Sequence, residues 1–109
     1  MGRAMAATED ILSRCRRVLA AHYGARLRKV VLYGSAARGE AGPQSDLDLL
    51  VVLEEPVDLF AEVRRLVDLL YPLQLESDRY ISAKPAPARA FEAGRLQLYR
   101  TAQREGVAV

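Results

Sequence analysis

The sequence predicts an α/β (α+β) fold, in which a small mixed β-sheet is flanked by helices. Two short apolar runs, at 28–33 and 46–53, have the length of buried strands, and stretches with helical spacing precede, separate and follow them. Such alternation favours helices packed against one sheet. The 109 residues suit a single domain, 1–109, with one hydrophobic core.

The first third of the chain predicts a helix followed by a strand. Thr8-Glu9-Asp10 places a hydroxyl cap and two acids at a helix start, and Gly24 ends that helix. The strand is expected over Arg28 to Tyr33. Gly34-Ser35 breaks it, and 36–38 can begin a short helix with Ser35 at its N-cap.

The middle of the chain predicts a loop, a second strand and a second long helix. The loop runs from Glu40 to Ser45 with Gly42-Pro43 as its turn, and the strand runs from Asp46 to Leu53. Asp58 caps the helix. The apolar face expected for that helix comprises Leu59, Phe60, Val63, Leu66, Val67 and Leu70.

Prolines divide the last third of the chain. Pro72 is expected to start a third strand, over Leu73 to Ile81, and 85–87, with a proline at each end, is expected to be a linker. A final helix follows from about Ala88 to Arg104, weakened by Gly94. The last three residues, 107–109, suit a short strand.

Composition and charge exclude several classes of protein. The formal net charge of +2 does not indicate nucleic acid binding, because a solvated surface predicts it equally well. The single cysteine, Cys15, forbids an intrachain disulfide and lies on the apolar stripe of the first helix. No apolar run reaches the roughly 20 residues of a membrane span, and no signal peptide is recognisable. A cytoplasmic location is therefore expected.

Asp46 and Asp48 carry the functional information, because they stand two residues apart beside an apolar run. Residues i and i+2 of a strand project from the same face. Two carboxylates on one half-buried face repel each other unless a cation lies between them. Mg²⁺ uses such oxygen ligands and completes its shell with substrate phosphates. The pair therefore predicts a metal site.

The Gly34-Ser35 turn is the matching candidate for phosphate binding. Glycine allows close approach of the backbone, and N–H groups at a helix start favour anions. Ser35 adds a hydroxyl, and Arg38 can reach the same phosphates. Ser45, just before the acid pair, is a further nucleotide-binding candidate, or else caps the turn.

The segment from Leu32 to Val51, LYGSAARGEAGPQSDLDLLV, resembles the nucleotidyltransferase superfamily that includes DNA polymerase β. It fits the pattern Gly-Ser, then Arg-Gly, then Ser-Asp-x-Asp followed by a hydrophobic residue. The size of the chain and its C-terminal segment, 98–107, are similar to those of minimal nucleotidyltransferases of prokaryotes. The resemblance implies the polymerase β-like fold.

The resemblance also implies a reaction. Two Mg²⁺ ions, or Mn²⁺ in their place, bridge Asp46, Asp48 and the triphosphate of ATP or another nucleotide, and a nucleoside monophosphate passes to an acceptor hydroxyl. The family normally has a third carboxylate on a neighbouring strand. On the third strand expected here, Glu76 is the first candidate for that role and Asp78 is the backup. If Gln74 occupies the position of the third carboxylate instead, the site has no third acid.

Similar small proteins are often paired with a helical partner of the HEPN family, which implies an antitoxin that attaches AMP to a tyrosine of its toxin. The alternative is a weak or inactive nucleotide- and metal-binding protein that neutralises or scaffolds a partner. Transfer to a small molecule, such as an aminoglycoside, or to an RNA end ranks lower. The sequence leaves open a homodimer or a mixed complex.

Overall fold

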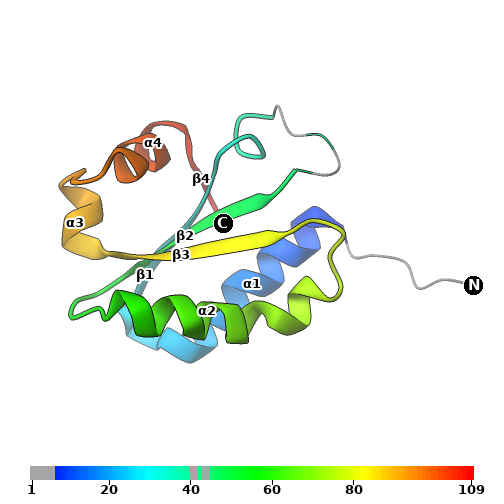
Figure 1. Ribbon diagram of the computed structural model, residues 1–109, viewed down its shortest axis with the longest axis horizontal. Coiled ribbons are helices and arrows are strands. Elements are labelled where there is room, and N and C mark those ends of the chain that lie inside the picture. Colours follow the sequence, from blue (N-terminus) through cyan, green and yellow to red (C-terminus); the bar gives the residue numbers. More distant parts are fainter. Residues whose placement is uncertain (1–6, 40–41, 43–44) are drawn as a thin grey trace, which may run out of the picture.

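A computed structural model describes residues 7–39, 42 and 45–109. A four-stranded sheet with the order β3-β2-β1-β4 lies between two layers of helices (Figure 1). The elements in chain order are α1 (Thr8–Tyr23), the 3₁₀ turn η1 (Gly24–Arg26), β1 (Leu27–Tyr33), β2 (Leu47–Leu53), α2 (Leu59–Gln74), β3 (Ile81–Pro87), α3 (Ala88–Glu92), α4 (Gln97–Glu105) and β4 (Val107–Ala108). This architecture confirms the predicted fold class.

The sheet is mixed, and its register aligns one residue from each of three strands. β1 and β2 run antiparallel with Tyr33 opposite Asp48. β2 and β3 run parallel with Asp48 opposite Ser82. β4 adds to the free edge of β1 in the antiparallel sense. Asp48 therefore has a side-chain neighbour on both of its flanking strands.

Alternate strand residues build two separate cores. The face toward α1 and α2 carries Leu47, Leu49 and Val51 of β2 within the larger cluster. The opposite face, toward α3 and α4, carries Leu50 and Val52 within the smaller one. Because parity alternates along a strand, Asp48 belongs to the α3–α4 face. None of the described helices has both the length and the apolarity needed to cross a bilayer.

The N-terminal half follows the predictions closely, with small differences at element ends. α1 ends before Gly24, and Asp58 caps α2 by accepting a hydrogen bond from the Ala61 amide at 3.2 Å. β2 begins one residue later than predicted, at Leu47. The short helix expected at 36–38 is instead a turn. The loop predicted from Glu40 to Ser45 lies partly outside the described residues, at 40, 41, 43 and 44.

The third strand predicted over Leu73 to Ile81 is wrong. α2 continues through Pro72 to Gln74, because the buried series Leu66, Leu70 and Leu73 keeps helical spacing across the proline. Pro72 lies in the last turn, so little helix follows it. The Gln74 side chain then holds the connection to β3 in place. Its Nε2 donates to the Arg79 carbonyl at 2.9 Å, and its Oε1 accepts from the Ile81 amide at 2.7 Å.

The linker predicted at Pro85 and Pro87 is instead the edge strand β3. Odd-numbered residues of β3 direct their amides away from β2, as the bond of the Ile81 amide to Gln74 shows. Both prolines have this parity, so neither removes a ladder hydrogen bond. Proline is tolerated at such outer positions of an edge strand.

The helix predicted from Ala88 to Arg104 is two helices, α3 and α4, separated around Gly94. The apolar face predicted for α2 is also only half right. Leu66 and Leu70 are buried, but Phe60 is 89% exposed and Val67 is 60% exposed. Glu62 takes a core position instead, where its carboxylate accepts a hydrogen bond from the buried Tyr23 hydroxyl.

Candidate active site at the β1–β2 end

Gly34 brings the turn after β1 against the carboxylate of Asp48. Its φ of +78° is in the left-handed region, and a Cβ built on it would lie 2.6 Å from Asp48 Oδ2. Only glycine satisfies both conditions without strain. The amides of Ala37 and Arg38 then bond the Gly34 carbonyl at 3.1 and 3.3 Å, which folds the turn back on itself. The predicted phosphate turn and the predicted acid pair therefore meet.

β2 starts at the end of the sheet where that turn lies (Figure 1), and Asp46 and Asp48 flank its first residue, Leu47. Asp46 is exposed just before the strand, and Asp48 is half-buried within it. Burial raises the pKa of Asp48 above its ordinary value, the negative charge of Asp46 raises it further, and the positive charge of Lys84 opposes both. The repulsion between the two carboxylates is the condition that a bound cation relieves.

The other predicted nucleotide-binding residues lie around this end of the sheet. Ser35 is half-buried in the turn after Gly34. Arg38, further along that turn, donates from Nη1 to Glu105 Oε2 at 3.3 Å and so connects the turn to the end of α4. Ser45 is half-buried, and its amide bonds the Gly42 carbonyl at 3.1 Å just before Asp46.

Glu76 does not lie beside the aspartates, because the strand that was expected to carry it does not exist. It follows α2 and pairs with Arg14 of α1, with 2.6 Å between Arg14 Nη2 and Glu76 Oε2. Both partners come from the helical layer on the face opposite Asp48. Asp78 is exposed in the connection before β3. The Gln74 side chain makes both of its hydrogen bonds to the backbone of that same connection.

The strand that does flank Asp48 presents Ser82 and Lys84, which sequence reasoning missed. Ala86 lies in the core of the α3–α4 face, so by parity Ser82 and Lys84 lie on the Asp48 face. The alternation of Ile81, Ser82, Ala83 and Lys84 could have indicated a strand, but the prolines after it obscured that signal.

Tyr33 was also missed as a neighbour of the site. It stands opposite Asp48 on β1, and its side chain is 93% buried, being only 7% exposed. Within the part of the chain that the structure describes, its hydroxyl has no hydrogen-bond partner. Burial, with the nearby charge of Asp48, raises the pKa of Tyr33 to about 12. The phenol therefore stays protonated at neutral pH beside the acid pair.

The donor set suits a divalent cation held by two carboxylates. Asp46 and Asp48 offer hard oxygen ligands on one face, the arrangement through which Mg²⁺ is bound together with phosphates. Across residues 7–39, 42 and 45–109, no group of three or more His, Cys, Asp and Glu side chains could hold a metal ion. The three-carboxylate site expected with Glu76 is therefore not formed by these residues.

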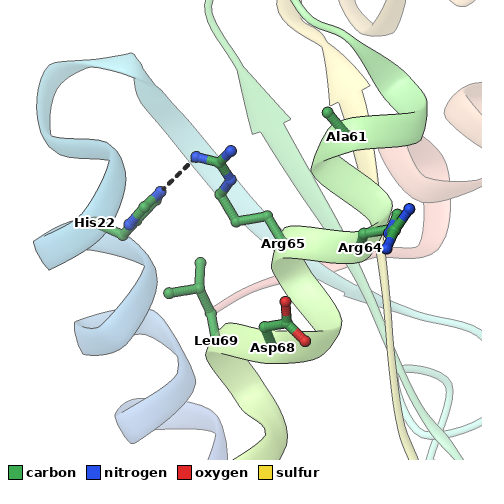
Figure 2. A pocket seen from close by; sticks show the side chains of 6 residues that line it. All are labelled: His22, Ala61, Arg64, Arg65, Asp68 and Leu69. Atoms are coloured by element: carbon green, nitrogen blue, oxygen red, sulfur yellow. Dashed lines mark hydrogen bonds between the residues drawn. The ribbon is translucent and has the colours of Figure 1, made fainter.

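A separate hollow of about 590 Å³ lies between α1 and α2, away from the acid pair. Figure 2 shows His22 facing Arg65, whose Nη1 lies 3.5 Å from His22 Nε2, and Arg64 directed away from both. Its other lining residues are Ala61, Asp68 and Leu69. Its lining includes one carboxylate, that of Asp68, and no glycine. It therefore has neither the acid pair nor the glycine turn found together at the end of the sheet.

Comparison with known proteins agrees with this geometry. Residues 12–97 match the family model of the nucleotidyltransferase domain. A solved structure provisionally described as a minimal nucleotidyltransferase is 29% identical, with a TM-score of 0.54 over 93% of this chain and 94% of that chain. A second, a provisionally described nucleotidyltransferase from Sulfolobus solfataricus, is 18% identical, with a TM-score of 0.49 over 99% of this chain and 89% of that one. No curated protein matches. The chain therefore belongs to the nucleotidyltransferase domain family.

Proposed function

We propose that this chain transfers AMP from ATP to the hydroxyl of a tyrosine on a helical, HEPN-type partner protein, as the antitoxin of a toxin–antitoxin pair. One observation carries the nucleotidyl-transfer part of the proposal: the Gly34 turn lies directly against the Asp48 carboxylate. Phosphate-binding backbone and metal-binding acids thus share one end of the sheet. The family to which the chain belongs supports the same reaction class.

In this reaction the acceptor oxygen attacks the α-phosphorus of ATP while the bond to the β-phosphate oxygen breaks. Pyrophosphate leaves, and the acceptor proton passes to solvent or to a carboxylate. The Gly34-Ser35 turn and Arg38 would hold the β- and γ-phosphates, and Asp46 and Asp48 would hold the divalent ions beside the α-phosphate. When bound there with the triphosphate, two Mg²⁺ ions, or Mn²⁺, neutralise the phosphate charge.

A protein acceptor is supported by apolar side chains exposed along α2. The α2 stripe, which we define as Phe60, Val63, Val67 and Tyr71, is 89, 43, 60 and 57% exposed respectively. Its spacing places these residues along one side of the helix, as in a helix that packs against another helix. A hollow of about 230 Å³ next to the stripe includes Tyr71, Tyr80 and Ile81, so this surface reaches the first residue of β3.

The test combines the chain with ATP labelled at the α-phosphate, Mg²⁺ and a HEPN-type protein supplied as the candidate partner. We expect label on a partner tyrosine and its loss in Asp46→Asn and Asp48→Asn. Asp68→Asn is the matched control, because Asp68 is an exposed aspartate of α2 outside the site. Val67→Glu should abolish transfer to the partner while leaving ATP binding unchanged. Label on no protein, with ATP still bound, would contradict the transfer.

A second candidate function is nucleotide binding without transfer. The observation that favours it is that the described residues place only two carboxylates at the site. In that case the chain binds ATP with Mg²⁺ and binds the partner, and the partner remains unlabelled. Mass spectrometry of the partner after incubation separates the two functions, since AMP attachment adds a fixed mass to one tyrosine.

A further inference from the structure

The edge strand β3 places a hydroxyl and an ammonium group where a third carboxylate would complete the metal site. Ser82 lies directly opposite Asp48 in the parallel pair, and Lys84 lies opposite Leu50, one step further along the same face. Adjacent strands are about 4.8 Å apart, so Ser82 is an immediate neighbour of Asp48. Lys84 is a diagonal neighbour, at a separation of about 7–8 Å that a long side chain can span. Ser82 is half-buried and Lys84 is exposed, which leaves the ammonium free to move toward the acids.

The charge of Lys84 acts on Asp48, opposing the effect of Asp46. The other lysine, Lys29, is accounted for elsewhere, because its Nζ lies 5.5 Å from the centroid of the Phe91 ring. At neutral pH the two aspartates contribute two negative charges, and Lys84 offsets one of them. These three described side chains therefore present one net negative charge to a divalent cation, instead of the three that three carboxylates would offer.

We propose that Ser82 and Lys84 replace the third carboxylate, so that the acid pair accepts a divalent cation only together with a nucleotide triphosphate. This inference rests on the proposed function, since it assumes that the site binds a nucleotide. The triphosphate supplies the oxygen ligands and the negative charge that β3 does not. Lys84 is in this view a positioning residue, whose positive charge offsets the negative charge of Asp48 until the metal–nucleotide complex arrives.

The test measures Mn²⁺ binding by electron paramagnetic resonance of the free ion, with and without a non-hydrolysable ATP analogue. For the wild-type chain we expect at least tenfold tighter Mn²⁺ binding with the analogue. Lys84→Met should tighten nucleotide-free Mn²⁺ binding severalfold, and Ser82→Asp combined with Lys84→Met should tighten it at least tenfold. Lys29→Met is the matched control and should leave nucleotide-free binding unchanged.

Two results would overturn the inference. One is tight Mn²⁺ binding by the wild-type chain without nucleotide, and the other is equal nucleotide-free binding by the wild type and Lys84→Met. Because Lys84 is exposed, Lys84→Met keeps the test decisive even if Ser82→Asp fails to fold. If the analogue binds to no variant, the proposed function fails, and the response of nucleotide-free Mn²⁺ binding to Lys84→Met still decides the role of Lys84.

Discussion

Replacing Gly34 with alanine should destabilise the protein through two separable effects. The first is the left-handed backbone, at φ +78°, which costs roughly 1–2 kcal/mol for a residue with a Cβ. The second is the overlap with Asp48 Oδ2 at 2.6 Å, which forces that carboxylate out of its position. Displacing a side chain from its rotamer costs about 0.5–1.5 kcal/mol. We therefore expect Gly34→Ala to lose about 1.5–3.5 kcal/mol of unfolding free energy in urea denaturation.

Gly39 supplies the control for the backbone effect. It belongs to the same turn and has φ +72°, but a Cβ there meets no atom of the described residues within 4 Å. Gly39→Ala should therefore lose only the first part, about 1–2 kcal/mol. In an Asp48→Ala background, Gly34→Ala should lose no more than Gly39→Ala, because the overlapping carboxylate is gone. Equal losses for Gly34→Ala and Gly39→Ala in the wild-type background would refute the reasoning, as would additivity of Gly34→Ala with Asp48→Ala.

Three further predictions follow from contacts away from the turn. Tyr23→Phe removes the hydrogen bond to the buried Glu62 carboxylate and should lose about 1–3 kcal/mol of unfolding free energy in urea, more than Tyr80→Phe at an exposed position. Burial raises the pKa of Cys15 to about 11 from 9.0. Its contribution to stability should therefore be complete below pH 9 and decline as the pH rises toward 11, so Cys15→Ala should flatten the dependence of the melting temperature on pH in that window. Glu76→Gln breaks the pair with Arg14 but should leave ATP affinity, measured by calorimetry, unchanged, whereas Asp48→Asn should weaken it.

The parts of the site that could be predicted from sequence are those close together along the chain. Gly34 directly follows β1, Asp48 lies in the adjacent antiparallel strand β2, and their pattern reveals both the turn and the acids. The role of Glu76 depended instead on assigning a strand to 73–81, and that assignment depended on Pro72. Whether a proline ends a helix is decided by packing: here Leu70 and Leu73 hold α2 against the core on both sides of it.

The neighbours of Asp48 on β3 could not have been predicted, since they are defined by strand pairing and not by local pattern. Pro85 and Pro87 disguise the strand, and only its place at the edge of the sheet makes them acceptable. Which apolar residues of α2 are buried and which are exposed likewise depends on contacts between elements and not on local pattern. Periodicity places Val63 and Leu66 on overlapping faces, and only the position of α1 determines that Leu66 is buried while Val63 is 43% exposed.

The same edge strand constrains how a partner protein can approach the site. With prolines at two of its outward amide positions, β3 cannot donate a full ladder of hydrogen bonds to an added strand. A partner therefore gains more by packing on side chains, and the α2 stripe leads along the helix to Tyr71 and the adjoining hollow at Ile81. Ile81 pairs with Leu47, which lies between the two aspartates in the chain. Under the proposed function, a helical partner seated on the stripe would thus reach the end of the sheet that carries the acid pair, approaching it from the α1–α2 side.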